Sequence, residues 1–198
     1  MSEEETQVVF RVPLWISVPI TVLISLVASS LTLGLYALAL WSSFIAWAEY
    51  FALGAKPDAL KPIWLLFPLG ALTMAFFALF NHIFIINFGW NSWVSVAVWL
   101  FIWVLIAVYI MQFHPIFQRG NLPYFNGLSM FLALYFALYL PGGFSCPAGV
   151  GCGPVTGNPY LDPWILWIWI SLSGIFGGFL GWLNIQLSFP KVVKVSKS

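Results

Sequence analysis

The stretch WSSFIAWAEYFALGAKPD, residues 41–58, decides how the rest of the chain is interpreted. It carries Glu49, the only acidic residue inside an apolar segment, and it ends in the first charged turn. In a helix, one face of this stretch is small and polar and consists of Ser42, Ala46, Glu49 and Leu53. The opposite face is aromatic and can meet lipid. A carboxylate inside a membrane is costly, so Glu49 is expected to turn toward the interior of a helix bundle.

The composition of the chain is that of an integral membrane protein. Hydrophobic residues make up 62% of its 198 residues and charged residues only 7%. Apolar blocks of roughly 18 to 25 residues fit into the sequence six times, and each is long enough to cross a hydrocarbon core about 30 Å thick. The predicted fold class is therefore all-α, an integral membrane bundle of six transmembrane helices that forms a single domain over residues 1–198.

Glycine, proline and charged residues mark the breaks between the predicted spans. The spans are expected at residues 12–30, 33–53, 63–86, 92–112, 124–140 and 164–187. Residues 1–11 form an acidic tail and residues 189–198 a basic tail. In residues 141–163 glycine and proline are too dense for a spanning helix, so this segment is expected to be a long loop. The N-terminal tail lacks the basic start of a cleaved signal peptide, so the first span is expected to be retained.

The basic residues indicate which way the bundle faces. With six spans, all seven fall on one side of the membrane, and they are Arg11, Lys56, Lys61, Arg119, Lys191, Lys194 and Lys197. Basic residues near span ends favour the cytoplasmic side, so both termini are expected in the cytoplasm and the loop 141–163 outside. The net charge is +1, and no basic cluster with interleaved aromatic residues is present, which argues against nucleic acid as a partner.

The two cysteines, Cys146 and Cys152, both fall in the loop expected outside the cell. An oxidising compartment permits a disulfide between them, and the alternative is a pair of free thiols. The spacing differs from that of a redox or metal-binding pair, and no histidine lies nearby.

Nothing in the sequence is typical of an enzyme or of a cofactor site. His82 and His114 are the only histidines, and they fall near opposite ends of the predicted bundle, too far apart to ligate one haem together. The sequence has no phosphate-binding glycine loop, no pair of carboxylates and no cluster of metal ligands. We therefore expect no cofactor, no metal and no enzymatic activity.

Glycines in the last predicted span are spaced for close helix packing. They form two overlapping pairs at intervals of four residues, and they are Gly174, Gly177, Gly178 and Gly181. Small residues at this spacing allow two helix backbones to approach closely inside a membrane. The partner helix can belong to the same chain or to a neighbouring protomer.

Two roles are open for Glu49. It lies about one turn from the inner boundary of its span, so it can reach the headgroup layer or pair with Lys56 or Lys61. Alternatively, Glu49 and Ser42 line a solute path that continues outward past Asn81 and His82, although these last two can also form a hydrogen-bonded interior pair.

The chain resembles a known family in three places: WxxFxxWAxYFAxG at residues 41–54, LPGGF at residues 140–144 and SGIFGGFLGW at residues 173–182. These patterns are similar to those of a family of small prokaryotic inner-membrane proteins classed only as a domain of unknown function. The resemblance covers most of the chain and implies a cytoplasmic (inner) membrane location, but it implies no activity and no catalytic residues. The chain departs from the family in its longer outer loop with two cysteines and in its charged N-terminal tail.

A looser likeness, in size and number of spans, is to the acetate/succinate and urea/amide channels, which form ring-shaped oligomers. The sequence start typical of the acetate family is absent. The expected function is a channel or transporter for a small neutral or weakly acidic solute, and transport coupled to protons is one form of it. The protein is expected to form a homo-oligomer in the lipid bilayer. The alternative is a structural or accessory subunit of a larger membrane complex.

Overall fold

The computed structural model describes residues 4–9, 12–31, 40–139, 156, 158–188 and 191–196. The described elements in chain order are β1 (Glu4–Val9), α1 (Leu14–Leu31), α2 (Leu40–Ala52), the 3-10 turn η2 (Pro57–Ala59), α3 (Leu60–Phe88), α4 (Ser92–Ile110), α5 (Ile116–Tyr139), α6 (Asp162–Ser188) and β2 (Lys191–Ser196). Cys146 and Cys152 lie outside the described residues, so their disulfide stays a prediction.

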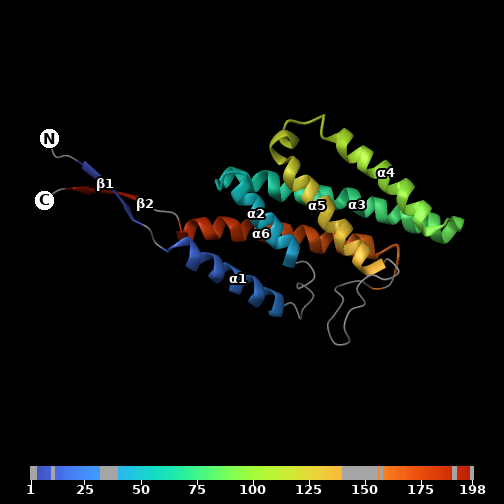
Figure 1. The fold of residues 1–198 in the computed structure, drawn as a ribbon, viewed down its shortest axis with the longest axis horizontal. Helices are drawn as coiled ribbons and strands as arrows, with labels where there is room; N and C mark the ends of the chain where they lie inside the picture. Colours follow the sequence, from blue (N-terminus) through green and yellow to red (C-terminus); the bar gives the residue numbers. More distant parts are fainter. Residues whose placement is uncertain are drawn as a thin grey trace.

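Helix α3 is the centre of the bundle, with α4, α5 and α6 packed around it and α2 packed on α6 (Figure 1). Three helices, α3, α4 and α6, are long and apolar enough to cross a membrane by length and composition. The all-α membrane-bundle class and its six helices are confirmed among the described residues. A short two-stranded sheet is added at the ends of the chain.

Helix α5 begins earlier than the sequence indicates. Residues up to 123 were expected to form a loop, but α5 starts at Ile116 and bends at Gly120, where φ is −113° and ψ is 16°. Pro123 follows this bend within the first turn of regular helix, a position that tolerates proline because its missing N–H has no helical partner there. A Cβ at position 120 would collide with the side chain of Leu66 on α3, so the bend occurs where the two helices touch.

Helices α3 and α5 run in the same direction and contact each other closely at two glycines. A Cβ added to Gly70 would overlap the carbonyl oxygen of Tyr124, and one added to Gly127 would overlap that of Phe67. The backbones of the two helices are therefore in direct contact. Inside a membrane, where lipid is as apolar as the protein interior, such close packing is a main source of helix association. The two glycines have no partner at a spacing of four residues, so the sequence pattern did not single them out.

The four glycines of α6 all face helices of the same chain. The backbone of Ser43 on α2 closes over Gly177, and the side chains of Trp47 and Tyr50 close over Gly181. On the α3 side, the other two glycines of the set, Gly174 and Gly178, meet the side chains of Phe67 and Trp64. This face of α6 is therefore occupied within the chain and is not open to a neighbouring protomer.

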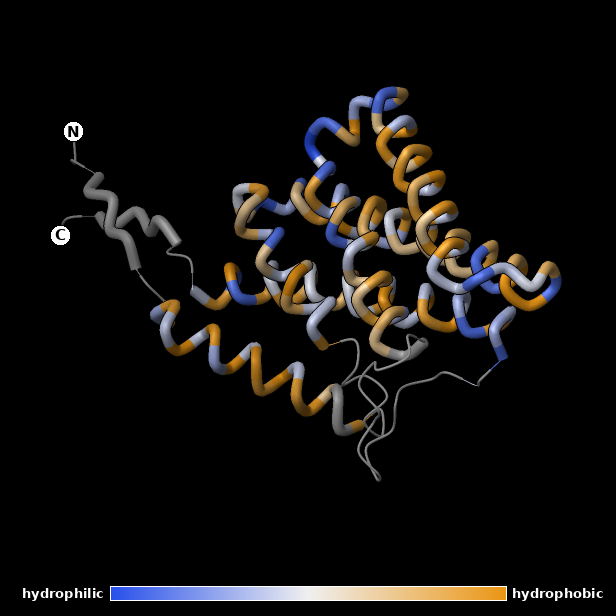
Figure 2. Tube along the Cα trace, turned by 45° about the vertical axis from the view of Figure 1, so that its right-hand side comes forward, coloured by the Kyte–Doolittle hydropathy of each residue, from blue (hydrophilic) through white to orange (hydrophobic). Residues whose placement is uncertain are grey.

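Helix α4 is the most peripheral of the long helices. It packs on α3 through an aromatic seam in which the rings of Phe76 and Trp103 stack at 5.4 Å between centroids and those of Phe80 and Trp99 lie at 4.9 Å. Only Ser95 and Ala107 are buried along α4. The helix is hydrophobic over nearly its whole length (Figure 2), so its outer face is suited to lipid.

The two tails, expected as separate cytoplasmic segments, are paired. Strands β1 and β2 are antiparallel, with Glu4 opposite Ser196 and Val9 opposite Lys191. They extend away from the bundle at the end where α6 finishes (Figure 1). The sequence-based interpretation missed this pairing because six-residue strands at opposite ends of a chain leave no local signal for their register.

Candidate functional site

The side chain of Glu49 is buried between α2 and α5. It is 2% exposed, and its Oε1 accepts a hydrogen bond from Nδ2 of Asn126 at 2.6 Å. Oε2 has no hydrogen-bond partner among the described atoms. Within the part of the chain that the structure describes, no ion pair joins Glu49 to Lys56 or Lys61, so the pairing considered from the sequence is replaced by an amide.

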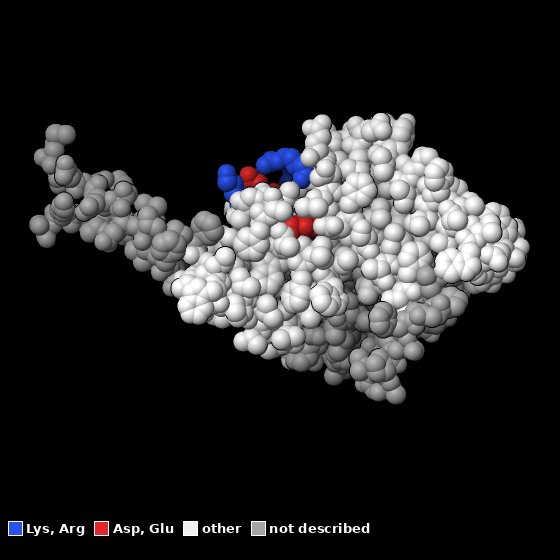
Figure 3. All heavy atoms as spheres, in the orientation of Figure 1, with Lys and Arg blue, Asp and Glu red and all other residues white. Residues whose placement is uncertain are grey.

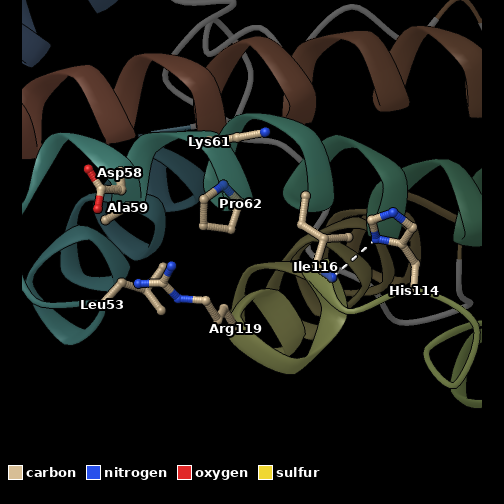
Figure 4. Close-up of a pocket in the computed structure, with 8 residues that line it drawn as sticks. All are labelled: Leu53, Asp58, Ala59, Lys61, Pro62, His114, Ile116 and Arg119. Atoms are coloured by element: carbon tan, nitrogen blue, oxygen red, sulfur yellow. Dashed lines mark hydrogen bonds between the residues drawn. The ribbon is translucent and has the colours of Figure 1, made fainter.

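A cavity of about 290 Å³ opens near the C-terminal end of α2, the helix that carries Glu49. Its lining comes from the end of α2, from η2 and the first turn of α3, and from the segment that begins α5, and consists of Leu53, Asp58, Ala59, Lys61, Pro62, His114, Ile116 and Arg119. Figure 4 shows Arg119 extending from α5 toward Leu53, while Lys61 lies on the α3 side. In the surface view, basic side chains and a few acidic atoms gather around a hollow at this end, and the rest of the described surface on this face is almost free of charge (Figure 3).

One face of α2 leads from this cavity into the bundle. Leu53 lines the cavity, and its N–H donates to the backbone oxygen of Glu49 at 2.8 Å, which places the carboxylate one turn further in. Ala46 and Ser42 follow on the same face, 0% and 1% exposed. The hydroxyl of Ser42 has no hydrogen-bond partner among the described atoms. The face predicted from the sequence therefore carries two buried polar atoms that the described protein leaves unsatisfied.

Asn81 and His82 lie at the other end of α3 and meet α5 through Tyr135. Nδ2 of Asn81 donates to the hydroxyl of Tyr135 at 2.9 Å, and the ring of His82 packs edge-on against the same tyrosine at 5.6 Å between centroids. Asp162, 0% exposed at the start of α6, accepts hydrogen bonds from the backbone and side chain of Thr156 and interacts electrostatically with His82. These residues form a second buried polar cluster.

The structure thus brings the predicted path residues together in two groups. Ser42 and Glu49 share a face of α2, and Asn81 and His82 share Tyr135. Asn126 and Tyr135 lie nine residues apart on α5, which at 100° per residue puts them on opposite faces of that helix. Sequence reasoning missed Asn126, although an amide inside an apolar span is a signal that could have identified it.

No group of three or more potential metal ligands occurs among the described residues. The fold and the cavity at the C-terminal end of α2 define a membrane helix-bundle protein with a buried carboxylate close to one end. The chain matches over residues 16–188 the family described as "Protein of unknown function (DUF1097)", and it belongs to that family. No curated protein and no solved structure matches it.

Proposed function

We propose that this protein is a membrane channel or transporter for a small neutral or weakly acidic solute, with the cavity at the α2–α3 end as the entrance. One observation carries the proposal: Oε2 of Glu49 is buried without a partner one turn beyond the cavity. A buried polar atom of this kind requires water or a bound molecule, because leaving it dry costs about 1–3 kcal/mol or more for a charged group.

The path runs along the small face of α2 from Leu53 past Glu49 and Ala46 to Ser42. Asn126 holds one oxygen of the carboxylate and leaves the other for water or solute. A carboxyl group in this position can also exchange a proton with the cavity, which supports a proton-linked form of transport.

The antiparallel pairing of β1 with β2 supports an even number of membrane crossings, because both ends of the chain must then lie on the same side. Together with the one-sided distribution of lysine and arginine, this pairing supports cytoplasmic termini. The cavity, which shares its end of the bundle with Lys61 and Arg119, then opens to the cytoplasm.

Reconstitution tests the proposal. In proteoliposomes, at least one of glycerol, urea and lactate should cross faster than in empty liposomes. Glu49→Gln keeps an oxygen facing Asn126 but cannot ionise, so it should alter the pH dependence of that flux while the protein stays monodisperse. Lys56→Gln, which changes an exposed charge outside the cavity lining, should behave like the parent. If all three solutes cross at the empty-liposome rate, transport is refuted for this class of solute.

The accessory-subunit alternative is favoured by a different observation, the exposed face of α4. This face displays large side chains over the length of the helix, among them Trp93, Phe101, Leu105 and Tyr109. The glycine face of α6 is already filled by α2 and α3, so docking through that face is not supported. Mild detergent purification separates the two proposals: a monodisperse protein that reconstitutes alone favours transport, and obligate copurification with other subunits favours the alternative.

A further inference from the structure

We propose that the cavity at the α2–α3 end binds the carboxylate of a small organic acid carrying a single negative charge, and that Arg119 is the group that recognises it. This inference rests on the proposed function and names the class of solute that enters the path.

The charges around the cavity select an anion. Lys61 and Arg119 both line it, and Asp58 is the only acidic residue among its described lining residues. Among the described residues no ion pair within 4.0 Å joins Asp58 to either cation. The cations therefore keep their charge available, and the lining has a net charge of about +1, which one monoanion balances. A dianion such as sulfate would leave excess negative charge beside Asp58.

The ends of two helices strengthen the same preference. Lys61 and Pro62 lie in the first turn of α3, and Ile116 and Arg119 lie in the first turn of α5. The N-terminal end of a helix carries a partial positive charge that favours anions. The C-terminal end of α2, which carries a partial negative charge, also lies at the cavity. Gly54, at a φ of 96°, reverses the chain there. The N–H of Ala55 then donates to Tyr50 O at 2.9 Å, which satisfies one of the last carbonyls of α2.

His114 adds a further donor. Its Nδ1 accepts a hydrogen bond from the backbone N–H of Ile116 at 3.1 Å, which assigns the ring proton to Nε2. The lining thus includes one arginine, one lysine and one histidine, and in Figure 4 the Arg119 guanidinium extends toward Leu53 while Lys61 and His114 lie farther along the cavity wall. Arg119 is the best placed of the three for a carboxylate because its planar fork can donate two parallel hydrogen bonds.

The remaining lining limits the size and nature of the acid. Leu53, Ala59, Pro62 and Ile116 supply apolar surface. A cavity of about 290 Å³ lies at the lower end of the range for small-ligand sites, about 300–1,000 Å³, which suits a short acid.

Calorimetry on the full chain in phosphatidylcholine nanodiscs tests the inference with lactate and lactamide, which differ in charge and hardly in size. Lactate should bind saturably at one site per protomer, and lactamide should not bind. Arg119→Gln should weaken lactate binding by about tenfold or more, and Arg119→Lys by less, because the charge remains but the fork is lost. Asp58→Asn should strengthen binding, because it removes the one opposing charge. Lys56→Gln, with a similar change in net charge outside the lining, should leave binding unchanged.

Four results would overturn the inference. These are no lactate binding to the parent, equal binding of lactamide, equal losses in Arg119→Gln and Lys56→Gln, or binding of sulfate at least as tight as that of lactate. A further arm adds phosphatidylglycerol to the nanodiscs. Loss of lactate binding there, with Arg119-dependent retention of the anionic lipid, would assign the cavity to a lipid headgroup instead. Lactate binding without flux of any solute would support the cavity site and refute the proposed function. Flux of glycerol or urea without lactate binding would support the proposed function and refute the cavity site.

Discussion

Asn126 Nδ2 lies 2.6 Å from Glu49 Oε1, and this one hydrogen bond joins the carboxylate of α2 to α5. The amide satisfies a single oxygen, and Oε2 remains without a partner among the described atoms. The pair therefore combines two properties that a site needs: an anchor that fixes the carboxylate and an acceptor left for a ligand or water.

Removing the anchor should cost stability. Asn126→Leu leaves a buried carboxylate without its donor, so the free energy of unfolding should fall by about 1–3 kcal/mol. Glu49→Gln retains an acceptor opposite Asn126, so its free energy of unfolding should fall by less. The double variant Glu49→Leu/Asn126→Leu should recover much of the loss, because it leaves no buried polar atom unpaired. Unfolding in detergent measures these changes, and strictly additive losses in the double variant would show that the two side chains are not coupled.

Two adjacent glycines of α6 should respond differently to the same change. Gly177→Ala places a Cβ against the backbone of Ser43, which cannot move without shifting α2, so a loss of about 1–3 kcal/mol is expected. Gly178→Ala meets mainly the side chain of Trp64, at 2.9 Å from its Nε1, and a side chain can rotate. That rotation weakens the bond of 3.1 Å from Trp64 Nε1 to Ile175 O, so the loss should be small but measurable. Equal unfolding temperatures for the two variants would contradict this difference.

The α3–α5 crossing gives a third stability prediction. Gly70→Ala would overlap the carbonyl of Tyr124, so it should push the two helices apart and lower the unfolding temperature by several degrees. Ala133→Leu on the exposed side of α5 adds more volume without a helix behind it and should have little effect. If both variants unfold like the parent in detergent, the close backbone contact is not present in the folded protein.

The sequence located the helices well because membrane crossing imposes length and composition on each span, and glycine, proline and charge mark the turns. It also identified the face of α2 that holds Ser42 and Glu49, since helical periodicity is a local property. The partner of Glu49 depends instead on which helix packs beside α2, and on the rotation of that helix. Neither is encoded locally, so Asn126 was missed.

The same limit explains the other differences. At Gly120, where α5 bends, a side chain would collide with Leu66, and at Gly70 it would collide with Tyr124, and both of these neighbours lie on another helix. The cavity collects residues from the segments around η2 and the start of α5, and these lie more than fifty residues apart in the sequence, as Asp58 and Arg119 illustrate. Only packing brings them together.

Topology can be tested with thiols. We expect Cys146 and Cys152, after reduction, to react with a membrane-impermeant reagent in intact cells, because the loop 141–163 is expected outside. In a variant with both cysteines replaced by serine, Thr6→Cys on β1 should react only after the membrane is opened. The pairing of Thr6 with Lys194 predicts that Lys194→Cys behaves in the same way. Labelling of Thr6→Cys and Lys194→Cys from opposite sides would refute the even number of crossings.

The last prediction separates a path from mere packing. Ser42 is 1% exposed, and its hydroxyl has no hydrogen-bond partner among the described atoms, on the same face of α2 as Glu49. If this hydroxyl is dry and only fills space, Ser42→Ala removes an unsatisfied polar atom, so the unfolding temperature should rise, because a buried unpaired group costs about 1–3 kcal/mol, and transport should not change. If the hydroxyl contacts water or solute in the path, as we propose, the same variant should leave the unfolding temperature nearly unchanged and should slow flux in proteoliposomes. Ser173→Ala is the matched control, since the Ser173 hydroxyl is buried but already donates to Trp169 O at 2.7 Å. Flux that is unchanged in Ser42→Ala, or slowed equally in Ser173→Ala, would place the path elsewhere in the bundle.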